Sequence, residues 1–240
     1  VLTSLIRRWT QAMHDARAAD ERADPFAAAG ASTPAQAAAL AKELTTLMDM
    51  VETEDVSLDG LASLVPETFS EHWQKTLQFL EIVTAFWPAH LAEQTLLSPA
   101  ARRNAVIRAE AKRLATTRPD APVIVAGVTG SIPATVELMR AVAGLPNGAI
   151  VLPALDTALD AASWQAIGSA DASADAKDRH PEHPQYGLKK LLDALGCDRA
   201  SVARLGKAPA EPVRARNRLI AETMRPAGTT QRWEAFAAEA

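Results

Sequence analysis

The sequence predicts a helix-rich α/β protein in two parts. We expect a helical subdomain over residues 1–118 and a partial parallel sheet flanked by helices over residues 119–240. Apolar residues recur at helical spacing through most of the first part. In residues 122–160, an apolar run, a glycine-bearing turn, an amphipathic segment and a second apolar run follow one another. That order is typical of a right-handed β–α–β crossover.

Three stripes of apolar residues predict the helices of the first part. They comprise Leu2, Leu5, Ile6, Trp9 and Met13, then Leu40, Leu44, Leu47 and Val51, then Trp73, Leu77, Leu80, Thr84 and Trp87. Prolines set the limits of these helices. Pro25 ends the first, Pro34 lies in the first turn of the second, and Pro88 kinks or ends the third. A further helix starts after Ser98, whose side chain is placed to cap it.

The second part predicts two strands, at Val123–Ala126 and Ala149–Leu152, with an amphipathic helix between them. Residues 168–184 are polar and show no apolar periodicity, so we expect a mobile loop there. One helix then ends at Gly196, a residue suited to a left-handed cap, and a last helix runs near residues 212–224.

Composition excludes several classes of protein. The chain has 240 residues, 48% of them hydrophobic and 22% charged, with a formal net charge of −4. This acidic balance argues against a strong, autonomous nucleic-acid binder, because phosphate contacts need excess positive charge. One cysteine, Cys197, rules out an internal disulfide or a cysteine-built metal site. No apolar run reaches the length of a membrane span. We therefore expect a reduced, cytoplasmic protein without a membrane partner.

The sharpest local signal is the turn at Gly127–Ser131. GVTGSIP resembles the GxxGxxG motif of short-chain dehydrogenases, in which glycines let the backbone approach a pyrophosphate. Asp156 follows the second strand, where an acid would hold a ribose, and Tyr186 and Lys190 have the YxxxK spacing. However, Pro133 replaces the third glycine, and the motif lies far from the start of the chain. An NAD(P)-binding enzyme is therefore an alternative interpretation.

A phosphate-binding loop of the Walker type is excluded at this turn, because no lysine follows Gly130 to reach the β- and γ-phosphates. The simplest structural interpretation is a helix start. In it Ser131 caps the helix, Pro133 lies in the first turn, and the glycines make the corner.

Two groups of basic residues are candidates for following a phosphate backbone. The first is Arg102, Arg103, Arg108, Lys112, Arg113 and Arg118, and the second is Arg204, Lys207, Arg214, Arg216 and Arg218. Taken alone, each is more simply the solvated face of a helix.

Other polar residues suggest less. His180, Glu182 and His183 have ligand chemistry, but the flanking prolines argue against a preorganised metal site. Asp156 and Asp160 follow the second strand, and we expect Asp160 to cap the helix that holds Trp164. No Ser–His–Asp arrangement or paired carboxylates indicate a catalytic site. The prediction is therefore no catalytic residue and no metal.

Several longer segments resemble one family in the same order. They are HWQKTLQFLEIVTAFWPAHLAEQ (72–94), PAARRNAVIRAEAKRL (99–114), PVIVAGVTGSIPATVELMRAVAGLPNGAIVLPALDTALD (122–160), HPQYGLKKLLDALG (183–196) and RLIAETMRPAGTTQRW (218–233). The chain from about Leu40 onward resembles the alphaproteobacterial type of the double-strand break repair protein family AddB. In this family, AddB is the second subunit of the AddAB helicase–nuclease, which resects broken DNA ends.

This resemblance implies that the chain corresponds to an internal, helicase-like region that has lost motor function. DNA and the AddA subunit would be its partners. The family's iron–sulfur cluster and divalent metal belong to a nuclease part that has no counterpart here, so no cofactor is expected. The function implied is a non-catalytic DNA-contacting scaffold; a purely structural interaction module without DNA contact remains a further alternative.

The residues expected to contact DNA come from the turn and from the first basic group. They are Thr129, Gly130, Ser131, Arg102, Arg103, Arg108, Lys112 and Arg113. We also expect exposed apolar surface where sheet neighbours would belong, which would favour self-association.

Overall fold

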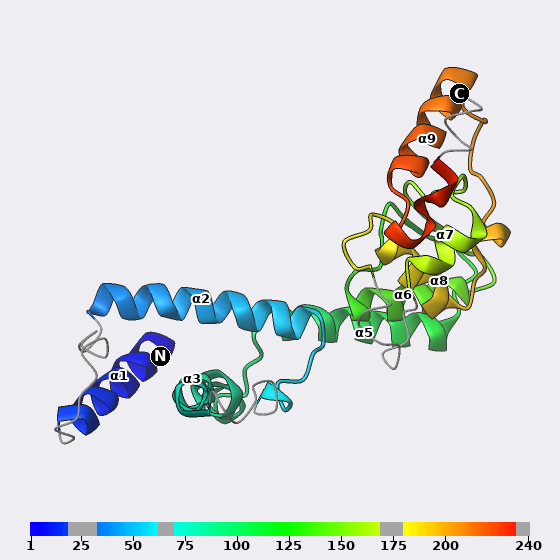
Figure 1. The fold of residues 1–240 in the computed structure, drawn as a ribbon. Helices are drawn as coiled ribbons and strands as arrows, with labels where there is room; N and C mark the ends of the chain where they lie inside the picture. The colour runs from blue at the N-terminus through cyan, green and yellow to red at the C-terminus, as the bar shows by residue number, and fades with distance from the viewer. Residues whose placement is uncertain (19–32, 62–69, 169–179, 234–240) are drawn as a thin grey trace. The chain divides into compact units, whose positions relative to one another are not determined.

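The computed structural model describes residues 1–18, 33–61, 70–168 and 180–233 (Figure 1). These residues form a helix-rich structure with a small two-stranded parallel sheet. The chain divides into two compact units, Val1–Ala105 and Val106–Ala240. The division falls within one helix, α5.

The first unit is built on helices α1 (Leu2–Ala18) and α2 (Pro34–Thr53). Thr33 and Gln36 form a capping box at the start of α2, and Pro34 lies in its first turn as predicted. Its core joins Leu2 and Ile6 of α1 to one face of α2 and to residues after α3. The buried members are Leu2, Ile6, Ala37, Ala41, Leu44, Met48, Ile82 and Val83.

The apolar stripe that predicted α2 lies along the edge of the buried face of that helix. Leu44 is buried as expected, but Leu40 and Leu47 remain 39% and 40% exposed. The buried face carries Ala37 and Ala41 instead, because small side chains let α1 approach closely. Leu40 and Leu47 are therefore partly exposed to solvent, whereas Leu44 is buried.

Pro88 is accommodated by a change of helix type. Helix α3 (Ser70–Glu81) continues into a π-helical turn, η4 (Ile82–Phe86), and then into α4 (Trp87–Glu93). The Trp87 N–H donates to the carbonyl of Ile82, five residues back. Proline cannot donate to the helix ladder and crowds the carbonyl four residues earlier. The wider π-helical turn therefore lets the helix continue past Pro88. The sequence predicted a kink or an end of the helix at Pro88, and the structure has a local widening of the helix instead.

Helix α5 (Pro99–Thr117) begins as the sequence indicated, with the Ala101 N–H donating to Ser98 Oγ at 3.1 Å. Within the first unit, the buried Asn104 amide donates to the carbonyl of Glu52 at 2.7 Å. Ser98 also hydrogen-bonds the Glu52 carboxylate. These contacts hold the start of α5 against the end of α2.

The second unit contains the predicted crossover. Strand β1 (Val123–Ala126), helix α6 (Pro133–Ala143) and strand β2 (Gly148–Val151) follow in order. The strands pair in parallel, with Val123 opposite Gly148 and Ala126 opposite Val151. The sheet is therefore real and parallel but, within the described residues, only two strands wide.

One face of the sheet is covered and the other is open. Val123 and Val125 pack beside Leu114 of α5 and Val142 of α6. Ile124 points to the opposite face and is 63% exposed. Parallel sheets are normally covered on both faces. Ile124 is thus an exposed apolar side chain on the sheet, and the self-association expected from such surface stays a prediction.

The rest of the second unit comprises α7 (Ala161–Ala166), α8 (Tyr186–Leu195), a 3₁₀ turn η6 (Arg199–Ser201), α9 (Glu211–Thr223) and a 3₁₀ turn η7 (Ala227–Arg232). Gly196 ends α8 with φ of 64°, which confirms the left-handed cap. A second core in this region is formed by Leu159, Trp164, Ile167 and Leu192. Of the loop expected at 168–184, residues 169–179 lie outside the described residues, and residues 181–185 form turns that lead into α8.

Candidate nucleic-acid interface

The glycine-bearing turn after β1 is a tightly packed corner. Gly127 and Gly130 have φ of 74° and 64°, in the left-handed region that favours glycine. Gly130 is buried, and a Cβ placed there would lie 2.7 Å from Leu191 Cδ1 of α8. This glycine is therefore required for the close approach of the corner to α8. Thr129 and Ser131, on either side of it, are exposed.

Ser131 does not cap the following helix, so that prediction was wrong. The N-cap of α6 is Ile132, in extended conformation, and it makes no side-chain cap hydrogen bond. Pro133 takes the first helical position as expected and fixes the backbone there. The Ser131 hydroxyl lies one residue too early to cap the first turn and remains on the surface.

The first basic group lies on α5, and several of its arginines bond to neighbouring side chains. Arg103 donates to Thr53 Oγ1 at 2.6 Å. Arg108 forms a 2.9 Å ion pair with Glu137 of α6. Arg113 donates through two nitrogens to Glu110, each at 2.7 Å. That hydrogen bond lowers the pKa of the Glu110 carboxyl and raises that of Arg113.

Arg102 and Lys112 are the exposed cations of this group for which no bond is recorded among the described residues. They do not form one continuous stripe with the rest. Arg102 and Arg113 are separated by about three helical turns and share a face, whereas Lys112 lies about a quarter turn from Arg113. The structure therefore brings together fewer free charges on one side of α5 than the sequence suggested.

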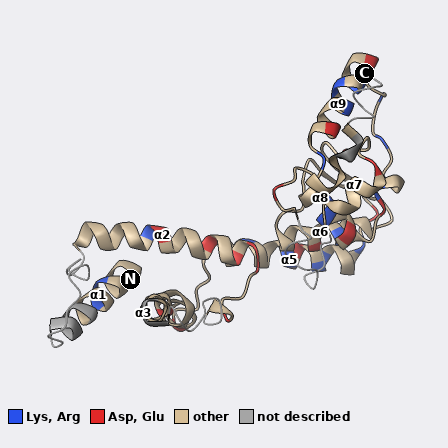
Figure 2. Cartoon of the chain, in the orientation of Figure 1, with Lys and Arg blue, Asp and Glu red and all other residues tan. Residues whose placement is uncertain are grey.

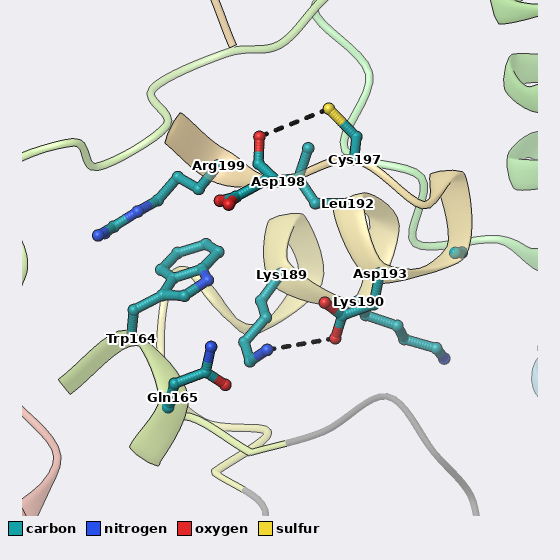
Figure 3. A pocket seen from close by; sticks show the side chains of 10 residues that line it. Trp164, Gln165, Lys189, Lys190, Leu192, Asp193, Cys197, Asp198 and Arg199 are labelled. Atoms are coloured by element: carbon teal, nitrogen blue, oxygen red, sulfur yellow. Dashed lines mark hydrogen bonds and ion pairs between the residues drawn. The ribbon is translucent and has the colours of Figure 1, made fainter. Parts of the chain in front are cut away.

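A hollow of about 730 Å³ lies between α7, α8 and the segment that follows α8 (Figure 3). The indole of Trp164 forms one wall, with the Arg199 guanidinium 4.6 Å and the Lys189 ammonium 5.8 Å from its ring centroid. Lys189 is buried and pairs with Asp193 at 3.2 Å. Arg199 donates to the carbonyls of Asp156 and Leu159. Sequence reasoning missed this cluster, because its members are spread over four segments.

The charges in this hollow largely satisfy one another. Lys189 and Arg199 are both engaged, and Lys190 is the exposed cation on the rim. The Cys197 sulfur lies 3.3 Å from Ser201 Oγ and 3.6 Å from the Asp198 carbonyl. Nucleophilic catalysis needs a thiol or hydroxyl beside a positioned base. Within the part of the chain that the structure describes, the Cys197 thiol bonds to these two oxygens and not to a basic side chain. The hollow thus has the chemistry of a packed aromatic–cation cluster.

The histidines near residue 180 are held by hydrogen bonds. His183 Nδ1 accepts from the Gln185 N–H at 3.1 Å, and its Nε2 donates to the Met224 carbonyl at 2.7 Å. His180 lies 3.0 Å from Glu182. Because both ring nitrogens of His183 are occupied, it is not available as a metal ligand. Among the described residues, no group of three or more potential ligands gathers.

A buried ionic network joins α7 to the end of α9. The Arg225 guanidinium contacts the carboxylates of Asp160 and Glu222, and donates to Ser163 Oγ at 2.5 Å. Asp160 caps α7 as predicted, accepting from the Ser163 N–H at 2.9 Å. That backbone hydrogen bond, together with Arg225, holds the pKa of Asp160 well below its usual range. The Glu222 carboxylate, with Asp160, raises the pKa of Arg225.

Asp156 is also used locally. One carboxylate oxygen accepts from the N–H groups of Ala158 and Leu159, at 2.7 and 3.0 Å. Because this Asp156 oxygen already accepts hydrogen bonds from the backbone of its own turn, it is poorly placed to bind the hydroxyls of a ribose. Tyr186 and Lys190 do share α8, and Pro133 occupies the first turn of α6 where the dehydrogenase motif has its third glycine.

Comparison of the chain with family models, with curated proteins and with solved structures finds no match. No helix in the described ranges is long and apolar enough to cross a bilayer.

Proposed function

We propose that this chain is a non-catalytic scaffold and DNA-contacting segment of a helicase–nuclease subunit that acts in double-strand break repair, with AddA as partner. One observation carries the proposal. The parallel β1–α6–β2 unit has the glycine corner of a nucleotide-binding fold without the lysine that would hold a triphosphate, and its sheet is open on one face. The longest segment that resembles the AddB family, residues 122–160, spans this unit.

The open face supports the scaffold part of the proposal. Ile124 is 63% exposed on a strand whose neighbours Val123 and Val125 are packed. A parallel sheet with one bare apolar face is incomplete by itself, because such sheets form between two layers of helices. Further structure is needed to cover it, as within a larger subunit.

The DNA-contacting part rests on exposed polar groups. Thr129 and Ser131 present hydroxyls beside the start of α6, and Arg102 and Lys112 are exposed on α5. Hydroxyls, backbone N–H groups and cations contact the phosphate backbone without reading sequence. Few free cations and a net charge of −4 lead us to expect weak binding that is easily screened by salt.

Fluorescence anisotropy with a labelled single strand and a forked duplex tests this proposal. We expect binding at low salt that is lost as salt rises. Changing both Arg102→Gln and Lys112→Gln should reduce the dependence of log K on log salt by about 1.4, since each single-strand phosphate contact contributes about 0.7. A matched control is Arg8→Gln with Lys42→Gln, two exposed cations outside the predicted interface.

The outcome also separates the alternatives. Capture of AddA without any DNA binding would favour a purely structural interaction module. Thermal stabilisation by NADPH would favour the dehydrogenase interpretation, because a ligand that binds only the native state raises its apparent stability. DNA binding that is unchanged at high salt would refute the phosphate contacts proposed for α5.

A further inference from the structure

Helix α9 is almost entirely exposed. All ten residues from Glu211 to Ile220 are exposed, and Ala221 is the buried residue of the helix. Isolated helices shorter than about 12–15 residues are marginal in water, and α9 has 13. Ion pairs from Glu211 to Arg214 and Arg218 support it along one side. Its apolar residues lie elsewhere, as an unpartnered surface.

That surface is a short seam with a defined pattern. Val213 and Ile220 lie seven residues apart and are 36% and 52% exposed. Arg216 lies between them, three residues after Val213, and Met224 continues the seam just past the helix, at 41% exposure. Residues at i, i+3 and i+7 share one face of a helix. We call Val213, Arg216 and Ile220 the α9 seam.

Helix α2 carries the same pattern with the opposite charge. Leu40 and Leu47 lie seven residues apart and are 39% and 40% exposed, with Glu43 three residues after Leu40. Met50, 63% exposed, continues this seam. We call Leu40, Glu43 and Leu47 the α2 seam. Figure 2 shows acidic residues gathered toward the carboxyl-terminal end of α2 and basic residues along α9.

We propose that the α9 seam of one copy of this chain packs against the α2 seam of a second copy. The apolar residues of each seam, Leu40 with Leu47 and Val213 with Ile220, are seven residues apart, so they lie at matching positions along the two helices. Glu43 and Arg216 each lie three residues after the first apolar residue of their seam, so they face each other as opposite charges. A contact between two α9 seams would oppose two arginines, and one between two α2 seams would oppose two glutamates. Charge complementarity therefore selects the head-to-tail contact.

A head-to-tail contact has a distinctive consequence. It uses two different surfaces of each copy, so each added copy leaves one surface free, and the assembly does not stop at a dimer unless it closes into a ring. Each seam presents only a few side chains, so association should be weak and concentration-dependent.

Sedimentation velocity over a range of concentrations tests the proposal with two variants. Leu47→Glu removes the α2 seam and Ile220→Glu removes the α9 seam, and each alone should weaken association at least about tenfold. Each variant retains the other seam. An equimolar mixture of the two should therefore form a one-to-one complex and grow no further. Far-UV circular dichroism checks that both variants keep their helices, since both side chains are exposed.

Charge reversal gives an independent arm. Glu43→Arg and Arg216→Glu should each weaken association, and the two changes in one chain should restore it, while Lys207→Glu, an exposed residue outside both seams, should have little effect. Three results would overturn the proposal. They are a wild-type chain that stays monomeric at every concentration, a mixture that fails to form the complex, and association abolished by Ile124→Ser, which would assign it to the open sheet face.

Discussion

Replacing Arg225 by methionine removes the centre of the ionic network between α7 and α9. The Arg225 side chain is 3% exposed, and those of Asp160 and Glu222 are 22% and 17% exposed. The substitution removes the Arg225 guanidinium from two nearly buried carboxylates. Breaking a buried pair in this way costs about 3–5 kcal/mol. Because both carboxylates keep some contact with water, we expect a loss near the lower limit, about 3 kcal/mol.

Urea unfolding followed by circular dichroism measures this loss as a lower midpoint. Arg218→Met is a matched control, because Arg218 is 62% exposed and bonds Glu211 at 3.3 Å. It should change stability by less than about 0.5 kcal/mol. Combining Arg225→Met with Asp160→Asn should cost less than the sum of the single changes, because the second removes one stranded charge. Equal effects of Arg225→Met and Arg218→Met would refute this reasoning.

Further predictions concern pH and three glycines. Folding lowers the pKa of Asp160 below its ordinary value of 3.8. The ionised Asp160 carboxylate therefore contributes its full stabilisation at pH values above 3.8, and this stabilisation is lost as the pH falls further. Asp160→Asn should accordingly make the free energy of unfolding less dependent on pH in the acid range. Gly148→Ala should destabilise by at least about 2 kcal/mol in urea unfolding, because its Cβ would lie 1.8 Å from the Val142 carbonyl oxygen. Gly130→Ala should lower the thermal midpoint through its positive φ and the contact with Leu191, whereas Gly187→Ala, which has open space in α8, should raise it.

The crossover could be predicted from sequence because its signals are local. Val123–Ala126 is an apolar run that ends at a glycine turn, and the structure has a strand over that range. The second strand begins one residue earlier than expected, at Gly148, and the reason is tertiary. Only a residue without a side chain fits beside the backbone of α6 there. Local patterns do not contain that information.

The face of α2 and the state of the basic helix could not be predicted, since both depend on distant partners. Leucine spacing predicted a helix but could not show that its buried face carries Ala37 and Ala41 while Leu40 and Leu47 stay partly exposed. Likewise, a run of arginines in α5 indicated free charge, whereas Arg108 pairs with Glu137, 29 residues away. The Arg225 network links residues 62 and 65 apart and was missed altogether. Charge runs in a sequence do not show which charges meet in space.

The π-helical turn before Pro88 has a geometric consequence for the first unit. A π turn holds one residue more than an α turn, so every side chain beyond it is rotated by about 100° relative to an unbroken helix. This phase shift places Trp87 against the core and His90 beside it, with ring centroids 5.7 Å apart. The single extra residue therefore acts as a rotational offset that decides which side of α4 meets the protein and which side meets water.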